Sequence, residues 1–547
     1  MTRARNNPWA VLLCLCLGFF MVLLDVTIVN IAIPSIVDGL QASLDQVIWV
    51  LNAYTLTYAV LLITAGRLGD RFGQRNLFTL GLAVFVAASA ACGLSQSPNQ
   101  LIAARVVQAV GGALLTPQTL AILTTIFPPH RRGAAFGVWG AVAGVATIVG
   151  PTLGGVLVTY LDWRWIFYVN VPIGVVALLG SVLVIPDLRP GRAAGIEPVG
   201  VLLASAGLFG ITFGLIEGER FDWGQVAGPL SIPLIIAAGM ALVVLFFVWD
   251  RSRRSPLVPR ALFHDRNYSL MNWVGAALTF GMIGLFLPLT IYLQSALGFT
   301  AIKAGLTLLP MSLVSMPLAP IAGRLADRIG GKYILMTGLA LFAAGMGIID
   351  WRAATDSDWL TFLPGTLVAG AGMGMIFAPM ATVAMRNVRP ELAGAASGLL
   401  NTTRQLGGAV GGAVVGAVLQ NRLAVSLHDE AARRAAQLPA QMPPAARQRF
   451  VDAFSSAGKG GVAVGHSTSG GAAGLGGLPP QAAQQVAAVA HDVFAYGFIA
   501  AMRPTLAVPI AALAVASLSC LAIRRRQRAQ RKPARPAEET VPAARAS

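Results

Sequence analysis

The sequence predicts an all-α membrane protein, and three observations lead to that class. Hydrophobic residues make up 56% of the 547 residues and charged residues only 12%, a balance outside the range of soluble globular chains. The apolar residues come in blocks of about 20, the length that a helix needs to cross ~30 Å of hydrocarbon. Short segments rich in Arg, Gly and Pro separate the blocks. Because lipid cannot hydrogen-bond an open backbone, each block must be a helix.

Fourteen such blocks are expected to span the membrane. They lie near 9–34, 46–66, 77–96, 99–122, 134–158, 164–186, 199–217, 226–249, 268–293, 302–323, 333–350, 359–384, 393–419 and 497–523. The corresponding organisation is a six-helix half (1–190), two inserted helices (191–250), the first five helices of a second half (251–420), a flexible external loop (421–495), a last helix (496–523) and a basic cytoplasmic tail (524–547).

The net charge of +17 reflects the orientation of these helices. Basic clusters at 67–75, 131–132, 251–254 and 524–526 all fall on one side of the membrane if the number of spans is even. The positive-inside rule then places that side, and both termini, in the cytoplasm. We therefore expect a multi-pass protein of the cytoplasmic (inner or plasma) membrane and no nucleic-acid partner.

A ten-residue motif occurs twice, which indicates two related halves. The segment from Gly66 to Arg75 recurs from Gly323 to Lys332 with six of ten positions identical and an offset of 257 residues. The offset corresponds to eight helices, as expected for two six-helix halves separated by an inserted pair.

The motif combines acidic, basic and glycine residues in a tight cytoplasmic turn, and it predicts a gate. Its carboxylate can bind a neighbouring helix N-terminus when the inner side is closed and must release it when that side opens. An ordinary polar turn is the alternative, and the duplication favours gating. The predicted gating residues are Gly66, Asp70, Arg71, Gly73, Gly323, Asp327 and Arg328.

Asp25 is the only acidic residue deep inside a predicted span. An ionised carboxylate there is costly unless it is paired or protonated. Counting ~1.5 Å per residue puts Asp25 about 24 Å and Arg105 about 20 Å from the cytoplasmic side, so the two match in depth. We expect them to form a proton-coupling pair, directly or through Gln108; a static ion pair between helices is the alternative.

Other polar residues in the spans are candidates for lining a cavity. Thr27 and Asn30 share one face of their helix, and Asp25 lies some 140–200° away, so all three cannot face one cavity. Asn401, Arg404 and Gln405 share a face near the middle of the bilayer and either line the cavity or join helices. Close helix packing and a bend are predicted where small residues cluster around a proline, at Gly144, Gly150, Pro151, Gly154 and Gly155.

Several of these segments closely resemble the fourteen-helix drug:proton antiporter family of the major facilitator superfamily. They are 24–34, 66–75, 105–108, 150–155 and 163–174, and the likeness covers about 1–420 and the last helix. The resemblance implies the major facilitator fold, with Asp25 as the proton-coupling acid, Arg105 as a partner in proton movement and Gly150/Pro151 in the antiporter motif. Ala109 departs from the family pattern, which has Gly after Gln108.

These observations predict proton-coupled efflux of drugs, antibiotics or amphipathic metabolites by alternating access. The alternative is a proton-coupled uptake symporter or metabolite carrier on the same fold. The spans contain no paired carboxylates, His clusters or Ser/His arrangement, so we expect neither enzymatic activity nor catalytic residues. We also expect no metal site and no cofactor, because the four cysteines lack metal-ligand spacing and no phosphate-binding loop is present. The expected partners are the small-molecule substrate, protons and lipid, with the chain as a monomer.

Overall fold

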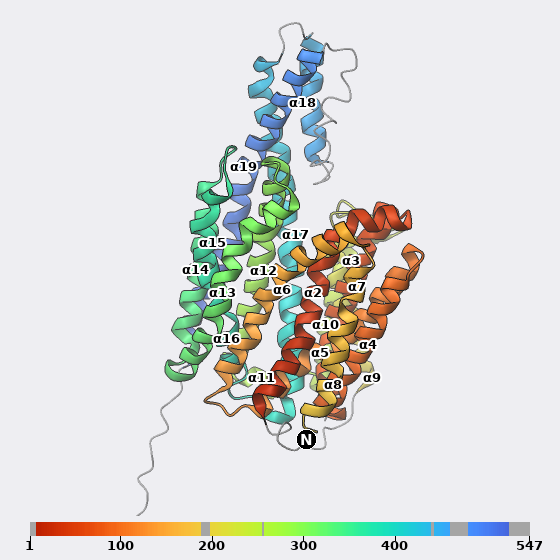
Figure 1. Cartoon of the computed structure of the whole chain (residues 1–547), viewed down its shortest axis with the longest axis vertical. Coiled ribbons are helices and arrows are strands. Elements are labelled where there is room, and N and C mark those ends of the chain that lie inside the picture. The colour runs from red at the N-terminus through yellow and green to blue at the C-terminus, as the bar shows by residue number, and fades with distance from the viewer. Residues whose placement is uncertain are drawn as a thin grey trace, which may run out of the picture.

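A computed structural model describes residues 7–187, 197–253, 256–438, 442, 444–459 and 480–524. The described chain is almost wholly helical, and its long helices run roughly side by side in two bundles (Figure 1). Asn7, Ser43 and Ser97 cap the first turns of α2, α3 and α5 with their side chains, which satisfies backbone N–H groups at those helix ends. The predicted basic tail after Arg524 lies outside the described residues.

The amino-terminal half consists of six long helical segments, the last of which is interrupted. They are α2 (Pro8–Leu40), α3 (Leu44–Phe72), α4 (Gln74–Leu94), α5 (Pro98–Ile126), α6 (Arg132–Tyr160) and the pair α7 (Trp165–Tyr168) and α8 (Asn170–Val184).

The inserted segment is a helical hairpin whose tip is a short antiparallel β-ribbon. Its elements are α9 (Pro198–Glu217), β1 (Gln225–Ala227), β2 (Leu230–Ser231) and α10 (Ile232–Arg251). α9 packs against α3 of the first half and α17 of the second.

The second half has the same order of long helices as the first, but its last two long helices, α17 and α19, are longer. Its elements are α11 (Ala261–His264), α12 (Arg266–Ile291), the π-helix η1 (Tyr292–Ala296), α13 (Ala301–Ile329), α14 (Gly331–Arg352), α15 (Trp359–Gly374), α16 (Phe377–Ala384), η2 (Pro390–Leu392), α17 (Ala393–Arg434), η3 (Ala435–Gln437), α18 (Pro444–Lys459), α19 (Pro480–Ser519) and η5 (Cys520–Ala522). The halves meet where α6 packs on α13 and α17 packs on α3.

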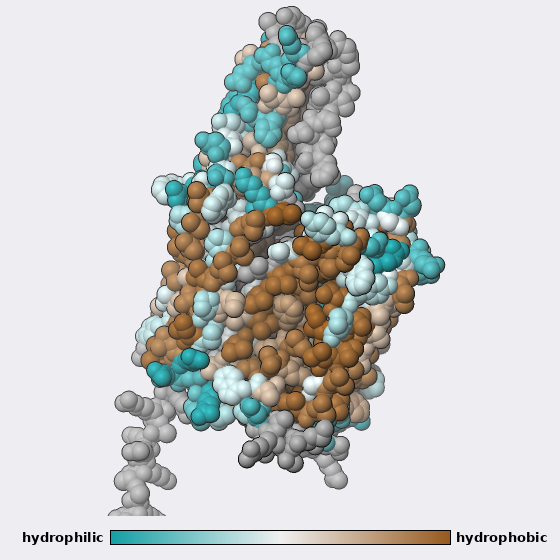
Figure 2. Space-filling model, viewed as in Figure 1, coloured by the Kyte–Doolittle hydropathy of each residue, from teal (hydrophilic) through white to brown (hydrophobic). Residues whose placement is uncertain are grey.

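Thirteen helices among the described residues are long and apolar enough to cross a membrane. They match thirteen of the fourteen predicted spans; the remaining one, 134–158, coincides with α6, a 29-residue helix that packs among the others. Hydrophobic residues cover the middle of the visible face, and hydrophilic residues gather toward its ends (Figure 2). The all-α membrane class is therefore confirmed, whereas the fourteenth span stays a prediction.

The prediction of a flexible loop at 421–495 is wrong for most of the described residues in that range. α17 continues to Arg434, α18 covers 444–459 and α19 begins at Pro480, and together they form a three-helix extension at the end of the molecule opposite the N-terminus (Figure 1). Its core contains Leu423, Leu427, Phe450, Phe454 and Phe494. Leucines four residues apart form an apolar stripe on this part of α17, and the other two helices pack against it. The Gly-rich tract at 460–479 lies outside the described residues.

Candidate functional site

A charged pair is buried inside the amino-terminal half. Asp25 on α2 is 0% exposed and Arg105 on α5 is 1% exposed. Arg105 Nη1 forms a salt bridge with Asp25 Oδ2 and also donates a 2.8 Å hydrogen bond to Gln108 Oε1. Gln108 Nε2 in turn donates to Asp25 Oδ1 at 2.8 Å. The two charges are thus joined both directly and through Gln108.

Two neutral residues that the sequence did not single out complete this arrangement. Asn170 Nδ2, at the start of α8, donates to Asp25 Oδ1 at 3.3 Å and to Ser89 Oγ at 3.1 Å. Gln108 Nε2 also donates to Ser89 Oγ, at 3.1 Å. We call Asp25, Arg105, Gln108, Ser89 and Asn170 the buried polar network. Its hydrogen bonds compensate the cost of removing the two charges from water.

Tyr54 lies between the buried polar network and the central cavity. Its ring centroid is 4.1 Å from Arg105 Cζ, a cation–π contact, while the same side chain lines the cavity. Asp25 itself does not line this cavity, although its neighbours Leu23 and Val26 do. A change in the position of Arg105 would therefore reach the cavity through Tyr54.

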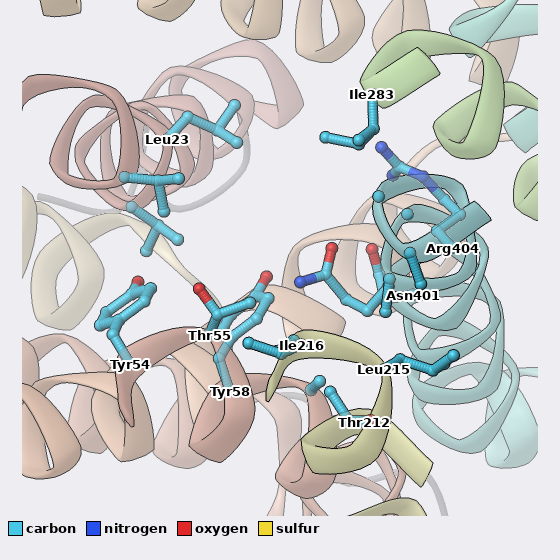
Figure 3. Close-up of a pocket in the computed structure, with 18 of the residues that line it drawn as sticks. Leu23, Tyr54, Thr55, Tyr58, Thr212, Leu215, Ile216, Ile283, Asn401 and Arg404 are labelled. Carbon is cyan, nitrogen blue, oxygen red and sulfur yellow. The ribbon is translucent and has the colours of Figure 1, made fainter. Parts of the chain in front are cut away.

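The central cavity has a volume of about 470 Å³ and lies between the two halves. Figure 3 shows Tyr54 and Tyr58 of α3 opposite Asn401 and Arg404 of α17, with α9 along a third side. Its walls are mainly apolar and aromatic, as in many small-molecule sites. The lining residues are Phe19, Val22, Leu23, Val26, Tyr54, Thr55, Tyr58, Ala59, Thr212, Leu215, Ile216, Glu219, Ile283, Asn401, Arg404, Gln405, Gly408, Ala409, Gly412 and Ala413.

Three of the six candidate lining residues face this cavity, namely Asn401, Arg404 and Gln405. Thr27, Asn30 and Gln108 are not among its lining residues, so a lining role for these three stays a prediction. Thr27 Oγ1 donates to the carbonyl of Leu24 at 3.0 Å, and Asn30 Nδ2 donates to the carbonyl of Val26 at 3.0 Å. Asn30 is exposed and lies one turn beyond the lining residue Val26 on the same face of α2, whereas Thr27 is half-buried and packs against Gly150 of α6.

The glycines of α6 pack against different neighbouring helices. A Cβ on Gly150 would overlap Thr27, and one on Gly154 would lie 2.8 Å from Cγ1 of Ile28, so both permit close packing on α2. Gly144 instead faces Ser315 of α13. A Cβ on Gly155 would meet no atom of the described residues within 4 Å, so nothing among them requires glycine there. The side chain of Pro151 lies outside the described part of the chain.

The two copies of the repeated motif make equivalent contacts at the end of the molecule where α2 begins, which we call the inner end. Asp70 accepts hydrogen bonds from the backbone N–H groups of Gly394 and Ala395, at 2.8 and 2.9 Å, at the start of α17. A carboxylate at a helix N-terminus is favoured by the free N–H groups and the helix dipole.

The second copy repeats this contact in the opposite direction. Asp327 of α13 accepts from the N–H groups of Gly133 and Ala134, at 2.8 and 3.1 Å, at the start of α6. Each half therefore holds a helix of the other half. We call the Asp70 and Asp327 contacts the two inner latches.

Glycine permits the close backbone approach at both latches. A Cβ on Gly66 would overlap the carbonyl of Gly394, and a Cβ on Gly323 would overlap that of Gly133. Gly73, between α3 and α4, has φ +96°, which a side chain would disfavour. Arg71 and Arg328 are exposed.

The comparisons with known proteins agree on one family. The model of the Major Facilitator Superfamily matches residues 15–412. The chain belongs to this superfamily. It is 34% identical over 515 residues to the tetracenomycin C resistance and export protein of Streptomyces glaucescens, covering 94% of this chain and 91% of that protein. It is 37% identical over 406 residues to a puromycin resistance protein of Streptomyces alboniger, covering 74% and 80%.

A solved transporter structure has a similar fold. The human organic anion transporter matches with a TM-score of 0.55 at 16% identity, covering 75% of this chain and 93% of that one. At this identity the likeness concerns the fold alone. The family match and the thirteen candidate membrane helices together make the chain a multi-pass membrane transporter of the major facilitator type.

Proposed function

We propose that this transporter exports drugs, antibiotics or amphipathic metabolites from the cell in exchange for protons. The observation that carries the proposal is the position of the buried polar network, one side chain away from the cavity: Arg105 contacts both Asp25 and Tyr54, and Tyr54 lines the cavity. The relatives named for resistance to tetracenomycin C and puromycin support the direction of transport.

In this mechanism, the charge of Asp25 determines the partner of Arg105. The ionised carboxylate holds the guanidinium in the buried polar network. When a proton neutralises Asp25, the attraction falls, and Arg105 and the ring of Tyr54 are free to move relative to the cavity. A proton that moves down the membrane potential supplies about 2.3 kcal/mol per 100 mV, which drives substrate uphill.

Alternating access then requires the two inner latches to open together. Both are closed in this structure, since each aspartate accepts two backbone hydrogen bonds from the opposite half. The structure therefore corresponds to the state that is closed at the inner end. Drug entry from the cytoplasm needs the alternative state, in which Asp70 and Asp327 release α17 and α6.

The test is uphill transport by purified protein in liposomes with an imposed pH gradient. Puromycin and tetracenomycin C, together with neutral and charged dyes, form the panel. We expect Asp25→Asn to abolish gradient-driven transport. Asp38→Asn, which makes the same change at an exposed position on the same helix, should leave it intact. Transport by Asp25→Asn that still responds fully to the pH gradient would refute the proposal, and movement of substrate in the same direction as protons would favour uptake.

A further inference from the structure

The inserted hairpin forms part of the cavity wall. α9 packs between α3 and α17, and its residues Thr212, Leu215 and Ile216 contribute to the lining (Figure 3). Glu219 also lines the cavity. Glu219 lies two residues beyond the end of α9 at Glu217. The two glutamates lie two residues apart, and their surroundings differ.

Glu217 is fully paired. It is 1% exposed, its Oε1 accepts a 2.7 Å hydrogen bond from Asn52 Nδ2, and its Oε2 forms a 2.9 Å salt bridge with Arg220. Because Asn52 belongs to α3, this contact fixes the end of α9 to the amino-terminal half. Glu217 therefore has a structural role.

Glu219 is not paired in this way. Its Oε1 is buried and has no hydrogen-bond partner among the described residues. The carboxylate lies against Gly416 of α17, where the Cβ of any other residue would overlap it. Burial raises the pKa of Glu219 above its ordinary value. A buried carboxylate oxygen without a donor is costly, and a ligand that brings a positive charge removes that cost.

Among the described residues, Arg404 is the only Lys or Arg in the cavity lining, and it is too far away to neutralise Glu219. Arg404 precedes Gly416 by twelve residues, or about 18 Å along α17. Arg404 Nε is buried without a hydrogen-bond partner in the described part of the chain, and its guanidinium lies 5.2 Å from the ring centroid of Phe377. The cavity is therefore acidic at one end and basic further in, with Phe19 and Tyr58 among the apolar and aromatic groups of its wall.

We propose that Glu219 binds the positively charged group, an ammonium or other onium centre, of an amphipathic substrate whose apolar body occupies the aromatic part of the cavity. Arg404 disfavours a second positive charge at the deeper end, so the best substrates are cationic at one end only. The inference rests on the proposed function in one respect: the bound compound is the one that is exported.

Equilibrium binding to the full-length protein in lipid nanodiscs, without a proton gradient, tests this site. The probes are tetraphenylphosphonium and tetraphenylborate, which have nearly the same shape and opposite charge. We expect the wild type to bind the cation more tightly. Glu219→Gln should weaken cation binding at least tenfold and leave the borate affinity unchanged or higher. Asp222→Asn is the matched control, because it removes an exposed negative charge from the same hairpin.

Two further variants separate the role of charge from that of folding. Glu219→Asp keeps the charge and should retain most of the cation affinity. Gly416→Ala keeps Glu219 but displaces its carboxylate, so it should weaken cation binding as Glu219→Gln does. Equal affinity of the wild type for the two ions, or full cation affinity in Glu219→Gln, would overturn the proposal.

Transport measurements distinguish this inference from the proposed function. A wild type that binds the phosphonium through Glu219 but moves no compound uphill under a pH gradient would refute proton-coupled export and leave the binding site standing. A wild type that exports neutral compounds uphill but does not prefer the phosphonium over the borate would refute the binding site and leave export standing.

Discussion

The amino-terminal half buries a charged pair where the carboxyl-terminal half has apolar side chains. The offset of 257 residues that relates Asp70 to Asp327 also relates Asp25 to Met282 and Arg105 to Phe362. Phe362 is 1% exposed and packs edge to face against a neighbouring tyrosine ring. The inner latches are therefore present in both halves, whereas the buried polar network is present in one.

This difference separates two tasks that a transporter must perform. In the proposed mechanism, opening and closing involve both halves, and each half has a latch on the other. In that mechanism, proton coupling needs only one carboxylate that gains and loses a proton. A second buried ion pair would add a desolvation cost without adding to the coupling. We therefore expect changes in the buried pair to have effects that no substitution at Met282 or Phe362 reproduces.

The largest expected effect concerns the stability of the buried pair. Asp25→Asn leaves Arg105 buried without its counter-ion, and breaking such a pair costs about 3–5 kcal/mol. Adding Arg105→Gln should recover most of the loss, whereas Met282→Leu should cost under about 1.5 kcal/mol. Denaturant unfolding of the purified variants measures these differences. A double variant less stable than either single variant would contradict the comparison.

The inner latches should give a smaller effect that is equal in the two halves. Asp70→Asn or Asp327→Asn weakens hydrogen bonds to a charged acceptor, which contribute about 1.5–3 kcal/mol. Each substitution should shift the protein toward the inner-open state about tenfold or more, and the double variant should show the sum of the two free energies. Distances between spin labels on the inner ends of the two halves report the populations. If either aspartate alone accounts for the whole shift, the latches are not equivalent.

Substituting glycines where helices pack closely should change the free energy of unfolding by a smaller amount. Gly394→Ala places a methyl group against the carbonyl of Gly66, and overpacking of this kind costs about 1–3 kcal/mol. Gly155→Ala adds the same methyl group where no atom of the described residues lies within 4 Å, so a change within about 0.5 kcal/mol is expected. Thermal unfolding in nanodiscs compares the stabilities of the two variants. Equal losses of stability would show that close backbone approach at the latch does not require glycine at position 394.

The smallest effect is the pH dependence of cation binding. The carboxylate form of Glu219 binds the cation, so affinity should be constant at high pH and fall a few-fold as the pH drops through the pKa of Glu219. Because burial raises that pKa, the fall should begin at a higher pH than for an exposed glutamate. Glu217 is already paired, so Glu219→Gln should lose this fall, and any pH dependence that remains in the variant would be assigned to Asp25 of the buried polar network.

The sequence predicts much of this molecule because the membrane restricts the alternatives. Apolar blocks of spanning length must be helices, and a count of residues along each helix is enough to bring Asp25 level with Arg105. Ser89 and Asn170 were missed because small polar residues are common in helices and only a tertiary contact distinguishes them. Glu219 was missed for a different reason: it lies beyond the last turn of α9, and its place in the wall depends on how the hairpin packs between the halves.

The uninterrupted course of α17 has a mechanical consequence. This helix has 42 residues, or about 63 Å, and carries Gly394 at one end, Arg404 and Gly416 along its middle and Leu427 in the three-helix extension. A tilt of about 10° around Gly394 would move its far end by about 11 Å. A fluorophore attached to the extension would therefore report rearrangements at the inner end of the molecule, so the working cycle of single molecules can be followed from the opposite end.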